Sequence, residues 1–306
     1  MSGPHEILGH AVGTRPVMCA IDEGEASRQA VRVAAWLARA LDTRLVLAYA
    51  FDPMGIGARP REEMLARDLT DDDLVHAERR AAQLLLEEAA KSVTDVELTP
   101  ELLEGEIVAE LLRLAVERWA VLLVAGTAAR GGLERVLAGS VSGALVASAP
   151  CPLVAVPRGA ALDEPGPVVV GYDGSAHSLR AARHAAALAA RLRRELVLLH
   201  VTGKEAVRPD EDLARDLYAA GLRGLGDEPG RPALDLTVRL AVEDGDPVQV
   251  LAAVGREEAA ALIVTGTRGR NALSSALLGS VSVGLVGAAG RPVALVPESA
   301  GDGPAG

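Results

Sequence analysis

Short apolar runs alternate along the chain with longer stretches in which apolar residues recur at helical spacing. The runs Val17–Asp22 and Leu45–Ala50 have the length of strands, and Ser27–Leu41 between them has helical periodicity. Because both runs are apolar almost throughout, their two faces must both be covered, which is typical of a parallel sheet between helices. The pattern predicts an α/β fold with a doubly wound parallel sheet.

The same pattern occurs a second time. The strand-like runs Val168–Asp173 and Leu196–Val201 enclose the helical stretch Ser178–Leu192, and Ser27 and Ser178 are the predicted helix N-caps. Equivalent positions are 151 residues apart as far as the second strand and 140 apart afterwards, so the second copy is shorter by 11 residues. A difference of this kind is tolerated in a surface connection. The chain is therefore predicted to contain two copies of one fold.

The division between the copies falls in a segment rich in Pro and Gly, residues 157–167. We predict one domain over residues 1–158 and a second over residues 159–306. The third strand of each copy is predicted within Asp95–Leu98, where the pattern is weak, and within Leu234–Leu240, which alternates well between apolar and polar residues.

Two further helix starts are marked by polar residues. Asp246 is a predicted N-cap, with Pro247 at the first helical position and Gln249 at the third. Thr70 precedes the acidic run Asp71–Asp73, which suits a helix N-terminus electrostatically. We prefer that interpretation to a metal site, and no metal site is predicted.

A glycine loop follows the fourth apolar strand of the second copy, Ala260–Thr265. Its spacing is Gly266-x2-Gly269-x9-Gly279-Ser280, and a helical apolar stripe comes next. A strand, a glycine loop and a helix N-terminus can gather backbone N–H groups around a phosphate. Ser280 could cap the helix as well as bind phosphate. The pattern is not a P-loop, because no Lys precedes Ser280.

The loop recurs in the first copy over residues 126–142, and both copies continue to a Pro-flanked apolar strand, 152–157 and 292–297. In these features the sequence resembles the universal stress protein family along nearly its whole length. The resemblance implies two tandem domains, each with five parallel strands in the order 3-2-1-4-5. It also implies ATP as the ligand, with Mg²⁺ as an open addition, and a regulatory or stress-response role.

The resemblance also implies the nucleotide-binding residues. Asp173 would lie at the adenine and ribose end, and the backbone of Val201 would bond the adenine edge. The residues expected around the nucleotide in the second copy are Gly171, Tyr172, Asp173, Val201, Thr265, Gly266, Thr267, Arg268, Gly269, Gly279, Ser280, Val281 and Ser282. Their expected counterparts in the first copy are Asp22, Ala50, Gly126, Thr127, Gly139, Ser140, Val141 and Ser142.

The first copy departs from the family pattern at two positions. Ala129 stands where the second copy has Gly269, and Ala128 stands where it has Arg268. If the glycine position needs a positive φ, a Cβ there costs roughly 1–2 kcal/mol. We therefore expect the first copy to bind ATP more weakly than the second, or not at all.

Composition narrows the function classes. The net charge of −11 and a pI near 5.1 oppose a nucleic-acid surface, and aromatic residues make up only 2% of the 306 residues. We see neither a signal peptide pattern nor a membrane-length apolar run, so a cytoplasmic protein without nucleic-acid or membrane partners is expected. Cys19 and Cys151 form no CxxC and are predicted to be reduced core thiols.

The leading hypothesis is an ATP-binding regulatory protein, and the alternative is a slow ATPase or another nucleotide phosphohydrolase or adenylyl-transferring enzyme. No catalytic residue is predicted, because His177 and His200 read as a surface histidine and a strand-end histidine. A dehydrogenase is disfavoured, since Gly-x-Gly-x-x-Gly follows neither first strand. The last strands, Leu153–Val156 and Val293–Val296, are expected to pair the two copies as an intramolecular pseudo-dimer. A homodimer of the whole chain is left open.

Overall fold

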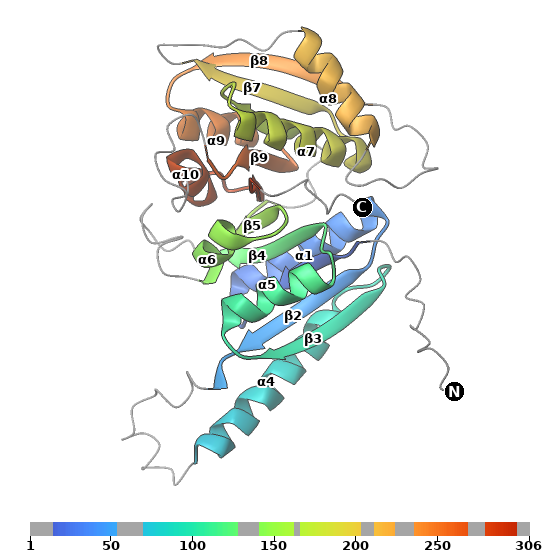
Figure 1. The fold of residues 1–306 in the computed structure, drawn as a ribbon, viewed down its shortest axis with the longest axis vertical. Helices are drawn as coiled ribbons and strands as arrows, with labels where there is room; N and C mark the ends of the chain where they lie inside the picture. Colours follow the sequence, from blue (N-terminus) through green and yellow to red (C-terminus); the bar gives the residue numbers. More distant parts are fainter. Residues whose placement is uncertain are drawn as a thin grey trace, which may run out of the picture.

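The computed structural model describes residues 15–53, 70–127, 141–161, 166–202, 211–223, 236–268 and 279–298. Over these residues the chain forms one ten-stranded sheet with helices on both faces (Figure 1). The strand order is β3-β2-β1-β4-β5-β10-β9-β6-β7-β8.

The first half of the chain supplies five strands and the helices that connect them. These elements are β1 (Val17–Ala20), α1 (Glu25–Leu41), β2 (Leu45–Phe51), α4 (Asp71–Lys91), β3 (Leu98–Glu104), α5 (Ile107–Glu117), β4 (Leu122–Thr127), α6 (Val141–Ser148) and β5 (Leu153–Pro157).

The second half repeats this succession. Its elements are β6 (Val168–Tyr172), α7 (Ala176–Leu192), β7 (Leu196–Thr202), α8 (Glu211–Arg223), β8 (Val238–Asp244), α9 (Pro247–Glu257), β9 (Leu262–Gly266), α10 (Ser280–Ala288) and β10 (Val293–Val296). Within each half all strand pairs are parallel and the order is 3-2-1-4-5. The predicted fold class is confirmed.

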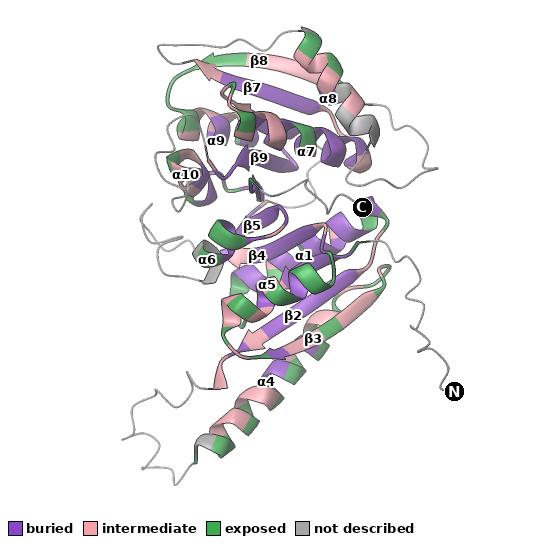
Figure 2. Ribbon diagram, viewed as in Figure 1, coloured by how far each residue is buried: buried purple, intermediate pink, exposed green. Residues whose placement is uncertain are grey.

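The halves meet at β5 and β10, the strands for which the sequence predicts pairing. They run antiparallel, with Val293 opposite Ala155 and Leu295 opposite Leu153. Both strands are buried along their length, and Figure 2 shows β5 in the colour of buried residues. Each therefore has a hydrogen-bonded neighbour on both sides, and among the described strands β3 and β8 are the two edges of the sheet.

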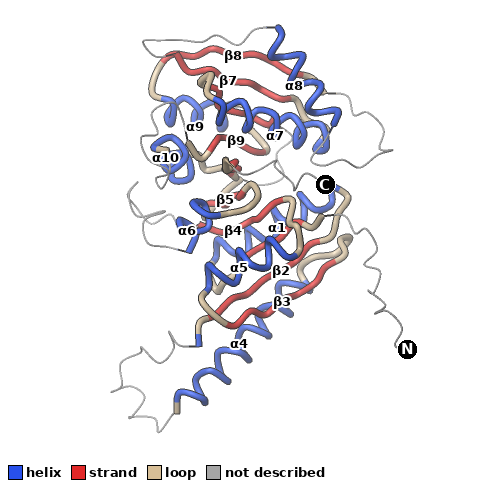
Figure 3. Tube along the Cα trace, in the orientation of Figure 1, coloured by secondary structure: helices blue, strands red, loops and turns tan. Residues whose placement is uncertain are grey.

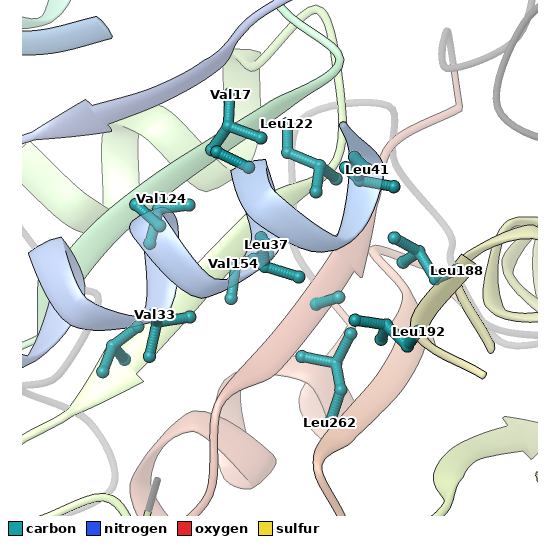
Figure 4. Close-up of a cluster of buried hydrophobic side chains, with 14 of the residues drawn as sticks. Val17, Val33, Leu37, Leu41, Leu122, Val124, Val154, Leu188, Leu192 and Leu262 are labelled. Carbon is teal, nitrogen blue, oxygen red and sulfur yellow. The ribbon is translucent and has the colours of Figure 1, made fainter. Parts of the chain in front are cut away.

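Two apolar layers lie on the two faces of the sheet, between the helices and strands that Figure 3 colours blue and red. One layer contains buried residues of α1, α4, α7 and α8, and it continues across the junction of the halves. There Leu37 and Leu41 of α1 share a cluster with Leu188 and Leu192 of α7 (Figure 4). The other layer contains buried residues of α5, α6, α9 and α10. Each layer contains residues of both halves, so the two halves share their core on both faces of the sheet.

The predicted N-caps Ser27 and Ser178 are wrong. Helix α1 begins earlier, with Gly24 as its N-cap, and α7 begins earlier with Ser175, whose side chain accepts a hydrogen bond from the Ser178 N–H. Both serines lie inside the first helical turn and are buried. Their hydroxyls instead face back toward the ends of the preceding strands, as described below.

The predicted third strands are misplaced. Strand β3 begins only at Leu98, which pairs with Leu45, the first residue of β2. Asp95, where the predicted segment begins, has a φ of 57° and lies in a turn. Strand β8 overlaps the predicted segment only from Val238 onward. As edge strands, both are only partly buried and lack the continuous apolar run that marks the inner strands.

The helix starts at Asp246 and at Thr70 are confirmed. The Asp246 carboxylate accepts hydrogen bonds from the N–H groups of Val248 and Gln249, each at 3.1 Å. Thr70 and Asp73 form a capping box at the start of α4. Cys19 and Cys151 are free and buried, as predicted.

Candidate functional site

The candidate site lies where the carboxyl ends of β6 and β9 meet. These strands are parallel neighbours, and the strand order reverses between them, since β7 lies on one side of the pair and β10 on the other. In open α/β sheets, ligands bind outside the carboxyl ends of the strands at such a reversal point. Asp173 follows β6 directly, and Thr267 and Arg268 follow β9 directly. The topology therefore brings together predicted residues that are far apart in the sequence.

Asp173 shapes the turn between β6 and α7. Its Oδ1 accepts a hydrogen bond from the Ser175 N–H at 2.9 Å, and its own N–H donates to the Ser178 hydroxyl at 3.3 Å. The first half repeats this geometry at Asp22, whose Oδ1 accepts from the Gly24 N–H at 2.8 Å. The Asp22 N–H donates to Ser27 Oγ at 2.9 Å. In both halves the aspartate and the first-turn serine fix the strand-to-helix connection.

Gly266 ends β9 where the first turn of α7 passes close by. A Cβ at Gly266 would lie 3.1 Å from the carbonyl oxygen of His177. At the equivalent Gly126, a Cβ would lie 2.6 Å from the carbonyl carbon of Ala26. Since both neighbours are backbone atoms, they cannot move aside as a flexible side chain could. The glycine that sequence reasoning assigned to phosphate approach is also required for packing of the first helix.

The two described ends of the glycine loop are hydrogen-bonded to each other. The Gly279 N–H donates to the Thr267 carbonyl oxygen at 2.8 Å, and the Ser282 hydroxyl donates to the Gly266 carbonyl oxygen at 2.7 Å. The Thr267 N–H in turn donates to Val296 O of β10 at 3.0 Å. These bonds place the N-terminus of α10 beside the end of β9.

Ser280 is not a helix cap, contrary to the sequence-based expectation. The N-cap of α10 is Gly279, which has no side chain for capping, and Ser280 is the first helical residue, with an exposed side chain. Its hydroxyl is therefore accessible at the helix N-terminus. The neighbouring Ser282 is buried, and its hydroxyl donates a hydrogen bond to the Gly266 carbonyl oxygen. To donate to a phosphate, as the sequence predicts, this hydroxyl would have to give up that bond.

A cluster of charged and polar side chains lies at this edge. The Arg268 Nη1 is 2.5 Å from Glu298 Oε2, and His177 Nε2 is 3.8 Å from Glu298 Oε1. Arg268 follows β9, His177 lies in the first turn of α7, and Glu298 lies two residues beyond β10. Sequence reasoning missed Glu298. The available signal was its place directly after the fifth-strand Pro297, which puts it at the carboxyl edge.

The other predicted residues of the second half lie along the same strands. Val201 is near the end of β7, beside His200, whose Nδ1 lies 2.8 Å from the Tyr172 carbonyl oxygen. His200 is a buried strand-end residue, as expected from the sequence. Gly171 is in β6, Thr265 is buried at the end of β9, and Val281 is in the first turn of α10. Gly269 lies outside the described residues.

In the first half, Asp22, Ala50, Gly126 and Thr127 occupy the equivalent strand ends. The segment 128–140, which contains Ala128, Ala129, Gly139 and Ser140, lies outside the described residues. Val141 and Ser142 begin α6.

Within the described ranges, no group of three or more His, Cys, Asp or Glu side chains is arranged to hold a metal ion. None of the described helices combines the length and the apolar character needed to cross a bilayer.

The fold and this edge define a class, namely tandem doubly wound α/β proteins with a glycine loop after the fourth strand of each repeat. The family model for the universal stress protein family matches residues 13–157 and again residues 166–297. The chain therefore belongs to the universal stress protein family, with two successive family units.

Curated relatives and solved structures agree with this assignment. Universal stress protein Rv2623 of Mycobacterium tuberculosis is 30% identical over 98% of this chain and 99% of its own length. A relative from Mycolicibacterium smegmatis is also 30% identical, over 92% of this chain and 96% of its own. The crystal structure of a universal stress protein from Archaeoglobus fulgidus covers 92% of this chain and 96% of its own, at a TM-score of 0.64 and 18% identity. That structure supports the fold.

Proposed function

We propose that the second half binds ATP at the carboxyl edge of β6 and β9 and that the protein acts as a nucleotide-dependent regulator. The observation that carries the proposal is the closure of the loop ends, in which the Gly279 N–H donates to Thr267 O at 2.8 Å. This bond sets the N-terminus of α10, capped by no side chain, beside Arg268. The N-terminus of a helix presents N–H donors and a partial positive charge to an anion.

The residues at this edge fit a nucleoside phosphate in charge and in donor type. The phosphates would face the N-terminus of α10, the Ser280 hydroxyl, Thr267 and Arg268. Asp173, Gly171, Tyr172 and Val201 lie at or next to the ends of β6 and β7, and the family resemblance assigns these strand ends to the adenine and ribose. Gly269 and Thr265 complete the set. Mg²⁺, if it accompanies ATP, would neutralise part of the phosphate charge.

We further propose that ATP is bound and not turned over at an enzymatic rate. Hydrolysis needs an oriented water and fixed cations on the developing phosphoryl charge. In the described loop ends, donors suited to ground-state binding are present, whereas Asp173 follows β6, the strand end assigned to the nucleoside. We expect release of phosphate well below the roughly 1–10³ s⁻¹ that is typical of enzymes. Several turnovers per second, abolished in Ser280→Ala, would contradict this.

The domain division and the pairing of the halves are part of the proposal. We propose that residues 1–158 and 159–306 form a permanent intramolecular pair in a cytoplasmic protein. The support is the antiparallel β5–β10 ladder together with the shared core around Leu37 and Leu188. Separation of the halves would expose two apolar strand edges to water.

The test compares the same substitution in the two halves. Any nucleotide released by denaturing the purified full chain is first identified by chromatography and mass spectrometry. Calorimetry with ATP then compares the wild type with Ser280→Ala and with the matched variant Ser140→Ala. Because the Ser280 side chain is exposed at the start of α10, its loss should leave folding intact.

We expect Ser280→Ala to weaken ATP binding about tenfold to a hundredfold, as for the loss of a hydrogen bond to a charged group. Ser140→Ala should change the measured affinity by less than about twofold, because the second half carries the binding. Unchanged affinity in Ser280→Ala, with circular dichroism showing an intact fold, would overturn the assignment of the site.

A further inference from the structure

Glu298 touches the cation that the proposed site would use for phosphate. Its Oε2 lies 2.5 Å from Arg268 Nη1, and its Oε1 lies 3.8 Å from His177 Nε2. The two oxygens of one carboxylate thus face two nitrogen groups from different elements. Two oxygens of a phosphate group present the same geometry to such a pair.

The side chains of Arg268 and His177 are recessed and the Glu298 carboxylate is outermost. The side chains of Arg268 and His177 are 24% and 25% exposed, whereas that of Glu298 is 58% exposed. The His177 Nε2 is itself buried, and it has no hydrogen-bond partner within the part of the chain that the structure describes. A phosphate that approaches Arg268 and His177 from solvent must therefore displace the Glu298 carboxylate or lie beside it. Displacement breaks the ion pair with Arg268, and a place beside the carboxylate brings two negative charges together, so both are electrostatically unfavourable.

The first half shows that this position is not constrained to be acidic. The residue equivalent to Glu298 is Arg158, which also follows the proline of the fifth strand. Arg158 pairs through Nη2 with Glu25 Oε2 at 2.6 Å, at the start of α1. The fold therefore accepts either sign of charge here, and the acid in the second half is a property of that site.

We propose that Glu298 is a selectivity residue of the second site, which competes with the phosphates of the nucleotide for Arg268 and His177. It lowers the affinity for ATP without lowering the affinity for adenosine. The inference rests on the proposed function, because it assigns a role within the same site.

The test is a double-mutant cycle on the full chain, measured by calorimetry with ATP and with adenosine. The variants are Glu298→Gln, Arg268→Gln and the double variant. Glu257→Gln is the matched control, since it removes one negative charge from an exposed position at the end of α9. That end of the helix precedes β9 and therefore lies at the opposite, amino edge of the sheet.

We expect Glu298→Gln to tighten ATP binding about fivefold, the size of a broken exposed ion pair, while adenosine affinity stays within about twofold. The gain should shrink to less than about twofold when Arg268 is already Gln, because Glu298 acts through Arg268. Glu257→Gln should bind both ligands like the wild type.

Three results would overturn the inference while leaving ATP binding established. These are an unchanged ATP affinity in Glu298→Gln, an equal gain for adenosine, and a full gain that persists in the Arg268→Gln background. If neither the wild type nor any variant binds ATP or adenosine, the proposed function falls, and this inference falls with it.

Discussion

The two halves have the same strand order but different charges at the same edge. In the second half, Arg268 after β9 pairs with Glu298 after β10. In the first half, the equivalents are Ala128 and Arg158, and Arg158 pairs instead with Glu25 at the start of α1. Each half therefore places one cation and one carboxylate near its first helix, but from different positions. The backbone fixes the places, and the side chains decide what each edge attracts.

The largest contrast concerns thiols, because both cysteines belong to the first half. Burial raises the pKa of Cys151 to about 12, and burial followed by the charge of Asp22 raises the pKa of Cys19 well above its ordinary range. Both should react with a disulfide reagent at pH 8 at least about 10³-fold more slowly than in the unfolded chain. The reaction rate then reports opening of the first half alone.

The direction in which stability changes with pH follows from the raised thiol pKa values of Cys19 and Cys151. The unfolded thiols ionise above about pH 8.5 while the folded ones stay protonated, so their contribution to stability is lost as the pH rises from there. Cys19→Ala and Cys151→Ser assign the two thiols. Rapid labelling of either thiol in the native protein would show that the first half opens easily.

The second contrast is in the strand-end glycines. Gly126→Ala should lower the free energy of unfolding by about 2–4 kcal/mol, because the new Cβ would lie 2.6 Å from the Ala26 backbone. Gly266→Ala should cost less, since its Cβ would meet His177 O at 3.1 Å. Urea unfolding followed by circular dichroism measures both. Equal losses would mean that the first helix approaches both strands equally closely.

A third contrast is in nucleotide stoichiometry. The full chain should bind one ATP, with the first half at least about tenfold weaker, because Ala128 and Ala129 replace Arg268 and Gly269. Calorimetry over a wide range of ATP concentrations separates the two classes of site. Two sites of equal affinity would contradict the predicted difference between the halves and would point to Arg158 as the residue that replaces the arginine missing at position 128.

The smallest contrast is in helix caps. Asp246 caps α9, and Glu106 caps α5 by accepting from the N–H groups of Val108 and Ala109. Asp246→Ala and Glu106→Ala should each cost about 1 kcal/mol. Thermal unfolding of the two variants measures the losses. Because the halves share their core, we expect one unfolding transition that either substitution shifts. Two transitions, of which each substitution shifts only one, would show that the halves unfold separately.

The inner strands could be predicted because they are apolar on both faces. Val17, Leu45 and Leu196 all begin buried strands at the predicted residue. The sequence pattern misplaces the edge strands β3 and β8, because a strand with one neighbour and partial burial does not need a continuous apolar run. The helix starts at Ser27 and Ser178 failed for another reason. A serine in the first turn can bond back to the strand end, and sequence spacing does not distinguish this from capping.

Site residues were predictable where they followed a strand and carried a recurring glycine spacing. Gly266, Thr267 and Gly279 do come together. The pairing of Arg268 with Glu298 spans 30 residues and depends on how β9 and β10 lie side by side. The place of Glu298 after Pro297 indicates the carboxyl edge, but no local pattern encodes its contact with Arg268, which could be found only from the fold.

The antiparallel joint between β5 and β10 has a consequence for how the two sites can change. When two identical chains assemble, any substitution appears in both subunits, and neither site can alter without the other. Here the joint lies within one chain, so a change at residue 158 leaves residue 298 untouched. The tether also keeps the two strands at high effective concentration, so that dilution does not separate the pair. Covalent union thus allows one half to keep a ligand while the other is free to take a different task.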